Sequence, residues 1–157
     1  QLHFDQSVIQ PITPSEYLDR HPTNQLATPG ASSWGLKGYG EQWVNESNAW
    51  TWRHVHAAGE RMVELARRHW GATNPIAVRA LKQAARELML AQASDWTFIM
   101  ATGTTVPYAT RRFNEHVVRF TRLYEDLTKG AVDEPYLASI EAQDNIFPDI
   151  DYRIYAT

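Results

Sequence analysis

Three long stretches of the chain carry apolar residues at intervals of three and four positions, which places those residues on one face of an α-helix. We expect these helices at about residues 48–70, 75–93 and 106–129. The positions on the buried face are Trp52, Val55, Gly59, Met62 and Ala66 in the first helix. They are Ala77, Leu81, Ala84, Leu88 and Ala91 in the second, and Phe113, Val117, Phe120, Tyr124 and Leu127 in the third. None of the three stretches alternates with the period of two that is typical of a strand. The pattern therefore predicts an all-α fold.

Local signals at the helix ends support these boundaries. Ser47 or Asn48 can cap the first long helix, and Asn74 followed by Pro75 is a cap with a first-turn proline for the second. Gly130 follows the third helix and is suited to the left-handed conformation that ends many helices.

Two shorter helices are predicted on the same grounds. The sequence TPSE at 13–16 is a capping box with proline at the first helical position, so a helix should cover about residues 14–20. Asp133 can cap another helix with Pro135 in its first turn, and this helix should end near Asp144.

The segments between and after these helices complete the architecture. Residues 21–40 contain six prolines and glycines and should form a long loop, a feature that is usually functional in compact domains. The tail at 145–157 should be irregular and pack on the bundle through its aromatic residues. Small residues on the helix faces would let helices approach closely: Ala58, Gly59, Ala66, Ala77, Ala84, Ala85 and Ala91. We expect a compact helical bundle of three long helices plus short helices, with a long N-terminal loop rich in aromatic residues and glycine.

The composition limits the classes of partner. The chain has 157 residues, no cysteine and a formal net charge of −3. Nucleic acids and anionic membranes require a basic surface, so neither is expected as a partner. The lack of cysteine excludes disulfides, thiolate zinc sites and cysteine nucleophiles, and it fits a cytoplasmic protein. No apolar run approaches the roughly 20 residues of a membrane helix.

Several groups of polar residues have simpler roles than catalysis. His54 and His56 are two positions apart on a helix and point in different directions, so they should pack rather than bind one metal. The sequence ATGTT at 101–105 lacks the lysine of a phosphate-binding loop and should be a turn. Four arginines alternate with acidic residues and predict a solvated face or salt links: Arg111, Arg112, Arg119 and Arg122.

Asp95 and Trp96 lie just after the second predicted long helix. A carboxylate beside an aromatic ring in such a turn could bind sugar hydroxyls, or it could cap the next helical turn, and both interpretations stay open. Cleavage of a glycosidic bond normally needs two carboxylates that flank it. Nothing in the sequence orients a second carboxylate toward Asp95.

Four of the six tryptophans lie within residues 34–52. Trp50 and Trp52 are at the start of a helix, where packing in the core is expected. Trp34 and Trp43 are in or beside the glycine-rich loop, where core residues are unusual. An indole provides a flat apolar face and one N–H donor, which suits contact with the apolar face of a sugar ring. From the residues alone, ligand contact and packing both remain possible for Trp34 and Trp43.

Longer motifs carry a resemblance to a known family. The segments "PSEYL", "SSWG", "W.N..N.W..RH.H.A..RM.ELA", "RAL.QAARE..LAQ.SDW.F" and "DNIFPDIDYR.YA" (dots mark positions that play no part) resemble the C-terminal helical region of family 57 glycoside hydrolases. The resemblance is strongest to the 1,4-α-glucan branching enzymes of that family, and it extends from about Thr13 to Ala156.

The resemblance implies a function for the whole enzyme and for this part of it. Family members have an N-terminal (β/α)₇ barrel with a catalytic Glu and Asp, and a retaining mechanism that transfers α-1,4-glucan segments to 6-hydroxyls, as in glycogen synthesis. The helical domain forms one wall of the cleft and needs no metal or cofactor. Trp34 and Trp43 match tryptophans of the family's cleft, and the resemblance makes Asp95 a cleft contact, with Trp96 beside it.

The resemblance also gives an expected domain organisation. Residues 1–12 read as a strand without a partner and match the end of the barrel, and residues 13–157 match the helical domain. Both catalytic carboxylates would lie upstream of Gln1, so we expect this chain to be inactive alone. It would be an excised domain, a proteolytic fragment or one chain of a split enzyme. Two alternatives are a parent α-amylase or 4-α-glucanotransferase, and a domain whose aromatic residues only contact the barrel.

Overall fold

The computed structural model describes residues 5–156, and the chain divides into one unit of residues 1–31 and another of residues 32–157. The first unit contains α1 (Pro14–Arg20). Thr13 accepts a hydrogen bond from the Glu16 backbone, and the Glu16 carboxylate accepts one from the Thr13 backbone. The predicted capping box is therefore confirmed. Residues 5–12 form no strand, and the first four residues of the expected strand lie outside the described part of the chain.

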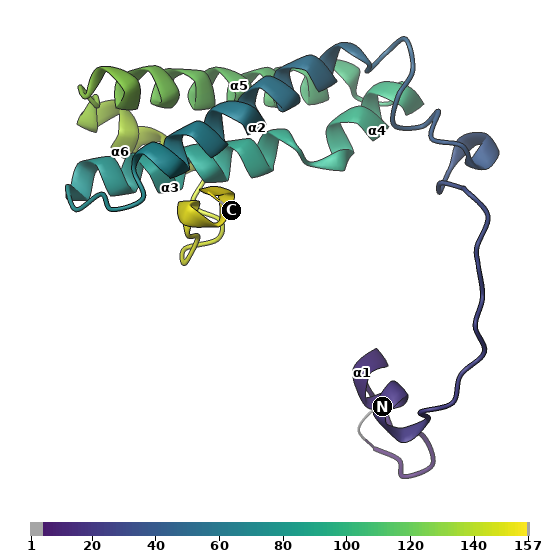
Figure 1. Cartoon of the computed structure of the whole chain (residues 1–157). Coiled ribbons are helices and arrows are strands. Elements are labelled where there is room, and N and C mark those ends of the chain that lie inside the picture. The colour runs from purple at the N-terminus through teal and green to yellow at the C-terminus, as the bar shows by residue number, and fades with distance from the viewer. Residues whose placement is uncertain (1–4, 157) are drawn as a thin grey trace. The chain divides into compact units, whose positions relative to one another are not determined.

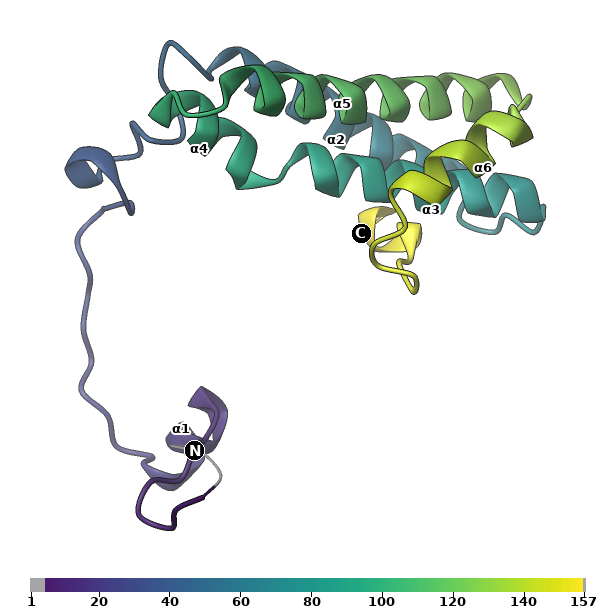
Figure 2. The same ribbon diagram turned by 180° about the vertical axis from the view of Figure 1, so that it is seen from behind.

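The second unit is built on three long helices, as the apolar pattern predicts. They are α2 (Trp50–Arg68), α3 (Pro75–Ala91) and α5 (Val106–Lys129). Helices α3 and α5 lie side by side and α2 runs obliquely across them (Figures 1 and 2), and each of the three contacts the other two. No strand occurs within residues 5–156, which confirms the all-α fold class.

Shorter elements complete this unit. They are η1 (Leu36–Gly38), α4 (Ser94–Thr102), α6 (Glu134–Gln143) and η2 (Tyr152–Ala156). The predicted cap of α6 is confirmed, since the Asp133 side chain accepts a hydrogen bond from the Tyr136 backbone. The tail folds back as predicted, with Ile150 and Tyr152 buried and the Tyr152 hydroxyl donating to the His69 carbonyl.

Three predicted ends of the long helices differ from the structure by two residues, including the end of α2, which lies at Arg68 rather than at about residue 70. The helix expected from residue 48 begins at Trp50, and its N-cap is Ala49, which makes no side-chain cap. Asn48 is fully buried, and its amide instead donates to the carbonyls of Gln42 and Thr97. The helix expected to reach residue 93 ends at Ala91, because Ala93 leaves the helical region with a ψ of 124°.

The core has two parts. The larger cluster joins α2, α3, α5, α6 and the tail, and it includes most of the predicted apolar positions of α3 together with Met62 and Ala66 of α2. The smaller cluster lies under α4 and contains Met100, Ala109 and Phe113, with Trp50 and Trp96 packed on it. The predicted burial of Trp52 was wrong, because this side chain is only half-buried.

The small residues of the helix faces are not equivalent. Ala58, Ala66, Ala84, Ala85 and Ala91 are buried in the core, as close helix packing requires. Gly59 was expected to share this role, but a Cβ atom built at this position would meet nothing within 4 Å. Gly59 therefore serves no close approach between helices.

Candidate functional site

Three aromatic side chains from the loop and α4 form a cluster at one end of the bundle. The ring centroids of Trp34 and Trp43 are 6.2 Å apart, and Phe98 lies 5.8 Å from Trp34 and 6.1 Å from Trp43. We call Trp34, Trp43 and Phe98 the aromatic face. Trp34 is 70% exposed although both other rings contact it. The structure thus brings the two sequence-predicted tryptophans together and adds Phe98, which the sequence analysis missed.

Hydrogen bonds hold the loop that carries the aromatic face. The Trp43 indole N–H donates to the Ser33 hydroxyl at 3.1 Å, and the Ser33 backbone donates to the Gly38 carbonyl. Gly35 has a φ of +100°, and a Cβ there would lie 3.2 Å from the Gln42 Cβ, so the turn needs glycine. These contacts give an exposed aromatic residue a defined position without burying it.

Asn48 ties this loop to the bundle. Its side-chain amide donates to the Gln42 carbonyl at 3.2 Å and to the Thr97 carbonyl of α4 at 3.1 Å, and its oxygen accepts from the Asn45 backbone at 2.8 Å. Thr97 precedes Phe98 in the chain. Asn48 therefore fixes the loop that carries Trp43 against the helix that carries Phe98.

Chemically, the aromatic face offers apolar ring surface with a free donor. The Trp43 indole N–H is already bonded, whereas that of Trp34 has no hydrogen-bond partner within residues 5–156. An exposed indole of this kind can contact the apolar face of a sugar while its N–H meets a hydroxyl.

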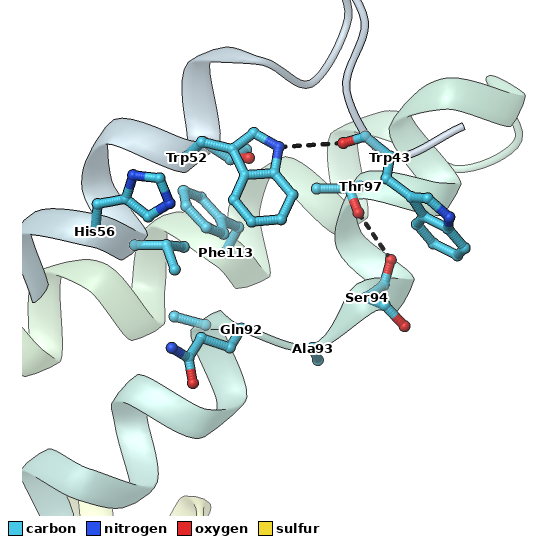
Figure 3. Close-up of a pocket in the computed structure, with 11 residues that line it drawn as sticks. Trp43, Trp52, His56, Gln92, Ala93, Ser94, Thr97 and Phe113 are labelled. Atoms are coloured by element: carbon cyan, nitrogen blue, oxygen red, sulfur yellow. Dashed lines mark hydrogen bonds between the residues drawn. The ribbon is translucent and has the colours of Figure 1, made fainter. Parts of the chain in front are cut away.

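Trp43 also lines a cavity of about 430 Å³ (Figure 3). Trp52 forms part of its wall, and the Trp52 indole N–H donates to the Trp43 carbonyl at 3.1 Å. Phe113 and the segment 92–94 also line it. Trp52, expected in the core, thus borders open space and is coupled to the aromatic face through the Trp43 backbone.

Asp95 and Trp96 have different surroundings. Asp95 is exposed in the first turn of α4, where a negative charge is favourable, but Ala93 rather than Asp95 is the N-cap. Trp96 is half-buried, its indole N–H donates to the Leu90 carbonyl at 2.7 Å, and its ring stacks on His116 at 6.2 Å. In the described structure, neither side chain has a hydrogen bond, ion pair or ring contact with Trp34 or Trp43.

The histidines and arginines behave largely as the sequence indicates. His54 contacts the rings of Trp50 and Phe113, whereas His56 contacts Trp52, so the two point to different neighbours. The four arginines of α5 all form salt links, which confirms that interpretation of the cluster. Their partners are Glu115 for Arg111, Glu115 and Asp144 for Arg112, Asp144 for Arg119, and Asp133 for Arg122.

Sequence reasoning missed a buried polar network between α3 and α5. Glu87 and His116 are fully buried, and the Glu87 carboxylate lies 2.7 Å from His116 Nδ1. The other Glu87 oxygen accepts from the Gln83 amide at 2.7 Å. Arg112 reaches both His116 Nε2, at 3.1 Å, and Asp144, at 3.2 Å.

The partners of His116 define its protonation. A guanidinium can only donate, so Nε2 of His116 accepts from Arg112. Nδ1 must then carry the proton and donate to Glu87. We therefore assign His116 as the neutral tautomer protonated on Nδ1, a bridge between the Glu87 carboxylate and the Arg112 cation.

Glu87, His116 and Asp144 could in principle present metal ligands, because their donor atoms lie within 4.8 Å of one another. The guanidinium groups of Arg112 and Arg119 already bind Asp144, and Arg112 also occupies His116 Nε2. A metal cation would face both arginine charges at short range. The network is therefore better suited to joining α3, α5 and the tail than to holding a metal.

The helices were compared with the length and apolar character of a membrane span. Among residues 5–156, none of the helices combines the length and the apolar character that a membrane span requires.

Comparison with known proteins places the chain in a family. The family model described as "1,4-alpha-glucan branching enzyme, C-terminal" matches residues 54–155. A curated 1,4-alpha-glucan branching enzyme of Thermococcus kodakarensis is 34% identical over 153 residues, which cover 94% of this chain and 22% of that enzyme. The chain thus spans about a fifth of this relative.

Solved structures of two branching enzymes and of an α-amylase also match the chain. A branching enzyme of family 57 from Pyrococcus horikoshii is 37% identical with a TM-score of 0.81, over 96% of this chain and 29% of that one. A Thermococcus kodakaraensis branching enzyme, crystallised with glucose and additives, is 32% identical with a TM-score of 0.84, over 96% and 28%. The α-amylase AmyC of Thermotoga maritima is 42% identical with a TM-score of 0.76, over 93% and 26%.

The family match covers the bundle from α2 to the tail, and the structural matches extend over nearly the whole chain. The chain therefore belongs to the family of C-terminal domains of 1,4-alpha-glucan branching enzymes.

Proposed function

We propose that this domain contacts α-glucan through Trp34 and Trp43 as part of a 1,4-α-glucan branching enzyme. The observation that carries the proposal is the aromatic face, in which Trp34 is 70% exposed yet held by two neighbouring rings and an anchored loop. Exposing a tryptophan costs favourable burial, so a tethered and exposed indole supports a role in binding. Asp95 and Trp96 are proposed as further contacts on α4.

The role of the domain in the reaction is to position glucan and exclude water. Branching requires that the 6-hydroxyl of an acceptor glucan, rather than water, attacks the glycosyl-enzyme intermediate. An aromatic wall that holds acceptor glucan raises its effective concentration, and it displaces water from the cleft. These two effects favour transfer over hydrolysis.

The catalytic carboxylates are proposed to come from the (β/α)₇ barrel of the whole enzyme, with residues 1–12 as its continuation into this domain. The barrel would then be the main protein partner, and the product a branched glucan such as glycogen, made in the cytoplasm.

A second candidate is the equivalent domain of an α-amylase. The observation in its favour is the 42% identity to the Thermotoga maritima α-amylase, which exceeds that of either branching enzyme structure above. A 4-α-glucanotransferase remains a further possibility for the parent. An assay of the full-length protein for new α-1,6 linkages separates branching from the other two activities.

The role of Trp34 is tested in the whole enzyme with Trp34→Ala. We expect a loss of glucan binding of about 1–3 kcal/mol, by analogy with stacking of bases on aromatic side chains, and little change in melting temperature. Trp70→Ala is a matched control, because Trp70 is also exposed, at 58%, but lies in the turn after α2. If Trp34→Ala branches at the wild-type rate, or if it unfolds the domain, the proposed contact is wrong.

A further inference from the structure

The cavity beside Trp43 has no role in the function proposed so far. It opens between α2 and the connection from α3 to α4, with Trp52 on one side and residues 92–94 on the other (Figure 3). Its volume of about 430 Å³ lies within the range of roughly 300–1,000 Å³ that small-molecule sites occupy.

We propose that this cavity is a glucosyl subsite, which binds a sugar unit of an α-glucan chain that passes the aromatic face. The inference rests on the proposed function, because it assigns the same class of ligand to a second place. It adds Trp52 and Gln92 as contact residues and gives the domain a means to favour longer chains.

The apolar part of the lining suits the faces of a sugar ring. The half-buried side chains of Trp43 and Trp52 line the cavity, together with the buried Phe113. The Trp52 indole is fixed by its hydrogen bond to the Trp43 carbonyl, and the Trp43 indole by its bond to Ser33. Both indoles are therefore held in place before a ligand arrives, which lowers the entropy that binding must overcome.

The polar part of the lining suits hydroxyl groups. Two of the lining hydroxyls already donate hydrogen bonds within the protein. Thr97 donates to the Ser94 carbonyl at 3.0 Å, and Thr51 donates to the Asn48 carbonyl at 2.8 Å. The side chains of Gln92 and Ser94 are exposed and, in the described structure, have no hydrogen-bond partner. An amide and a hydroxyl can each donate and accept, as neighbouring sugar hydroxyls also do.

Trp43 connects the cavity to the aromatic face. Its ring contacts Trp34 and Phe98, and the same residue lines the cavity. Glucan that lies against Trp34 can therefore extend past Trp43 toward Trp52. A chain long enough to reach the cavity gains contacts that a shorter chain lacks, so affinity should increase with chain length.

The test is a titration of the 157-residue chain with maltotetraose, followed by NMR of tryptophan indole and glutamine side-chain amide signals. Signals are assigned with Trp→Phe and Gln→Ala variants. We expect saturable shifts at the Trp52 indole and the Gln92 amide. Ser94→Phe, which places a bulky ring in the cavity lining, should weaken this binding by roughly tenfold.

Two further variants make the result specific. Ser139→Phe is the matched control, because Ser139 is also exposed but lies on α6, and its affinity should equal that of the wild type. Gln92→Ala removes the polar contact without filling the cavity and should also weaken binding. It provides the evidence if Ser94→Phe fails to fold.

The outcomes separate this inference from the proposed function. Shifts at Trp34 without shifts at Trp52 and Gln92 overturn the subsite and leave the aromatic face as the glucan contact. Shifts at Trp52 and Gln92 without shifts at Trp34 support the subsite and remove Trp34 from the contact. The absence of any shift overturns both.

Discussion

Replacing Glu87 with alanine should destabilise the domain strongly. Glu87 is fully buried on α3, where one carboxylate oxygen accepts from the Gln83 amide and the other accepts from His116 Nδ1 on α5, each at 2.7 Å. The substitution leaves both donors in the interior without their acceptor. It also removes the negative charge that faces His116 and Arg112.

The expected magnitude follows from these losses. The substitution leaves two buried donors, the Gln83 amide and the His116 Nδ1–H group, without an acceptor, and each unsatisfied donor costs about 1–3 kcal/mol. We expect a loss of about 3–5 kcal/mol from a total stability of roughly 5–15 kcal/mol. For a chain of this size, the melting temperature should fall by about 6–20 °C.

Two control variants identify the cause of the destabilisation by Glu87→Ala. Glu87→Gln keeps one oxygen for His116 but presents an amide N–H₂ to the Gln83 donor, so it should cost only about 1–3 kcal/mol. Glu125→Ala removes an exposed carboxylate of α5 that pairs with Lys129 at 3.3 Å, and it should change stability by less than about 0.5 kcal/mol.

Thermal and urea denaturation followed by circular dichroism measures all three variants. A melting temperature of Glu87→Ala equal to that of the wild type would refute the structural role of Glu87. The hydrogen-bond explanation is refuted if Glu87→Gln is as damaging as Glu87→Ala, because charge rather than hydrogen bonding would then dominate. That result would contradict the neutral His116 assigned from the geometry.

Three further predictions concern helix α2, pH and activity. Gly59→Ala should raise stability by about 0.5–1 kcal/mol in a thermal melt, because the new methyl group meets no atom and alanine favours the helix; a lower melting temperature would contradict this. Burial first, and then the charge of Arg68, lower the pKa of His69 below 6.5, so the unfolded chain binds the proton first as pH falls. The stability that neutral His69 contributes is therefore full above about pH 6.5 and decreases below it. In a series of melts at different pH, the melting temperature of His69→Gln should fall less steeply below pH 6.5 than that of the wild type. Equal slopes would exclude His69 as the cause of the pH dependence. The isolated chain should not branch or hydrolyse amylose, and turnover above a contaminant control would place the catalytic carboxylates within it.

The sequence alone determined the long helices, and it placed each of their ends to within two residues. Apolar residues three and four positions apart are sufficient to specify one buried face, and a capping side chain acts within a few residues of its own position. The capping box at Thr13, the cap at Asp133 and the stop at Gly130 therefore appear as predicted. The loop setting and the family motif both singled out Trp34 and Trp43, but the contact between their rings was found only in the structure.

Helix α4 could not be found in this way. Its sequence, SDWTFIMAT, is only nine residues long and distributes its polar and apolar residues without an apolar stripe. Other segments of the same chain determine the position of α4, because the Asn48 side chain donates to the Thr97 carbonyl and Gly103 ends the helix. Phe98 joins the aromatic face only as a result of this packing.

Tertiary structure also decided which polar residues are buried. Gln83 and Glu87 are four positions apart on α3, and Arg112 and His116 are four apart on α5, a spacing that equally describes a solvated face. Only the packing of α3 against α5, with Asp144 at the end of α6, buries Gln83, Glu87 and His116, whereas Arg112 stays partly exposed. Trp52 shows the reverse case, since its position in an apolar stripe predicts burial, but at this end of α2 the neighbouring helices leave a cavity. Periodicity defines which face of a helix is apolar, and only the arrangement of its neighbours determines how much of that face they cover.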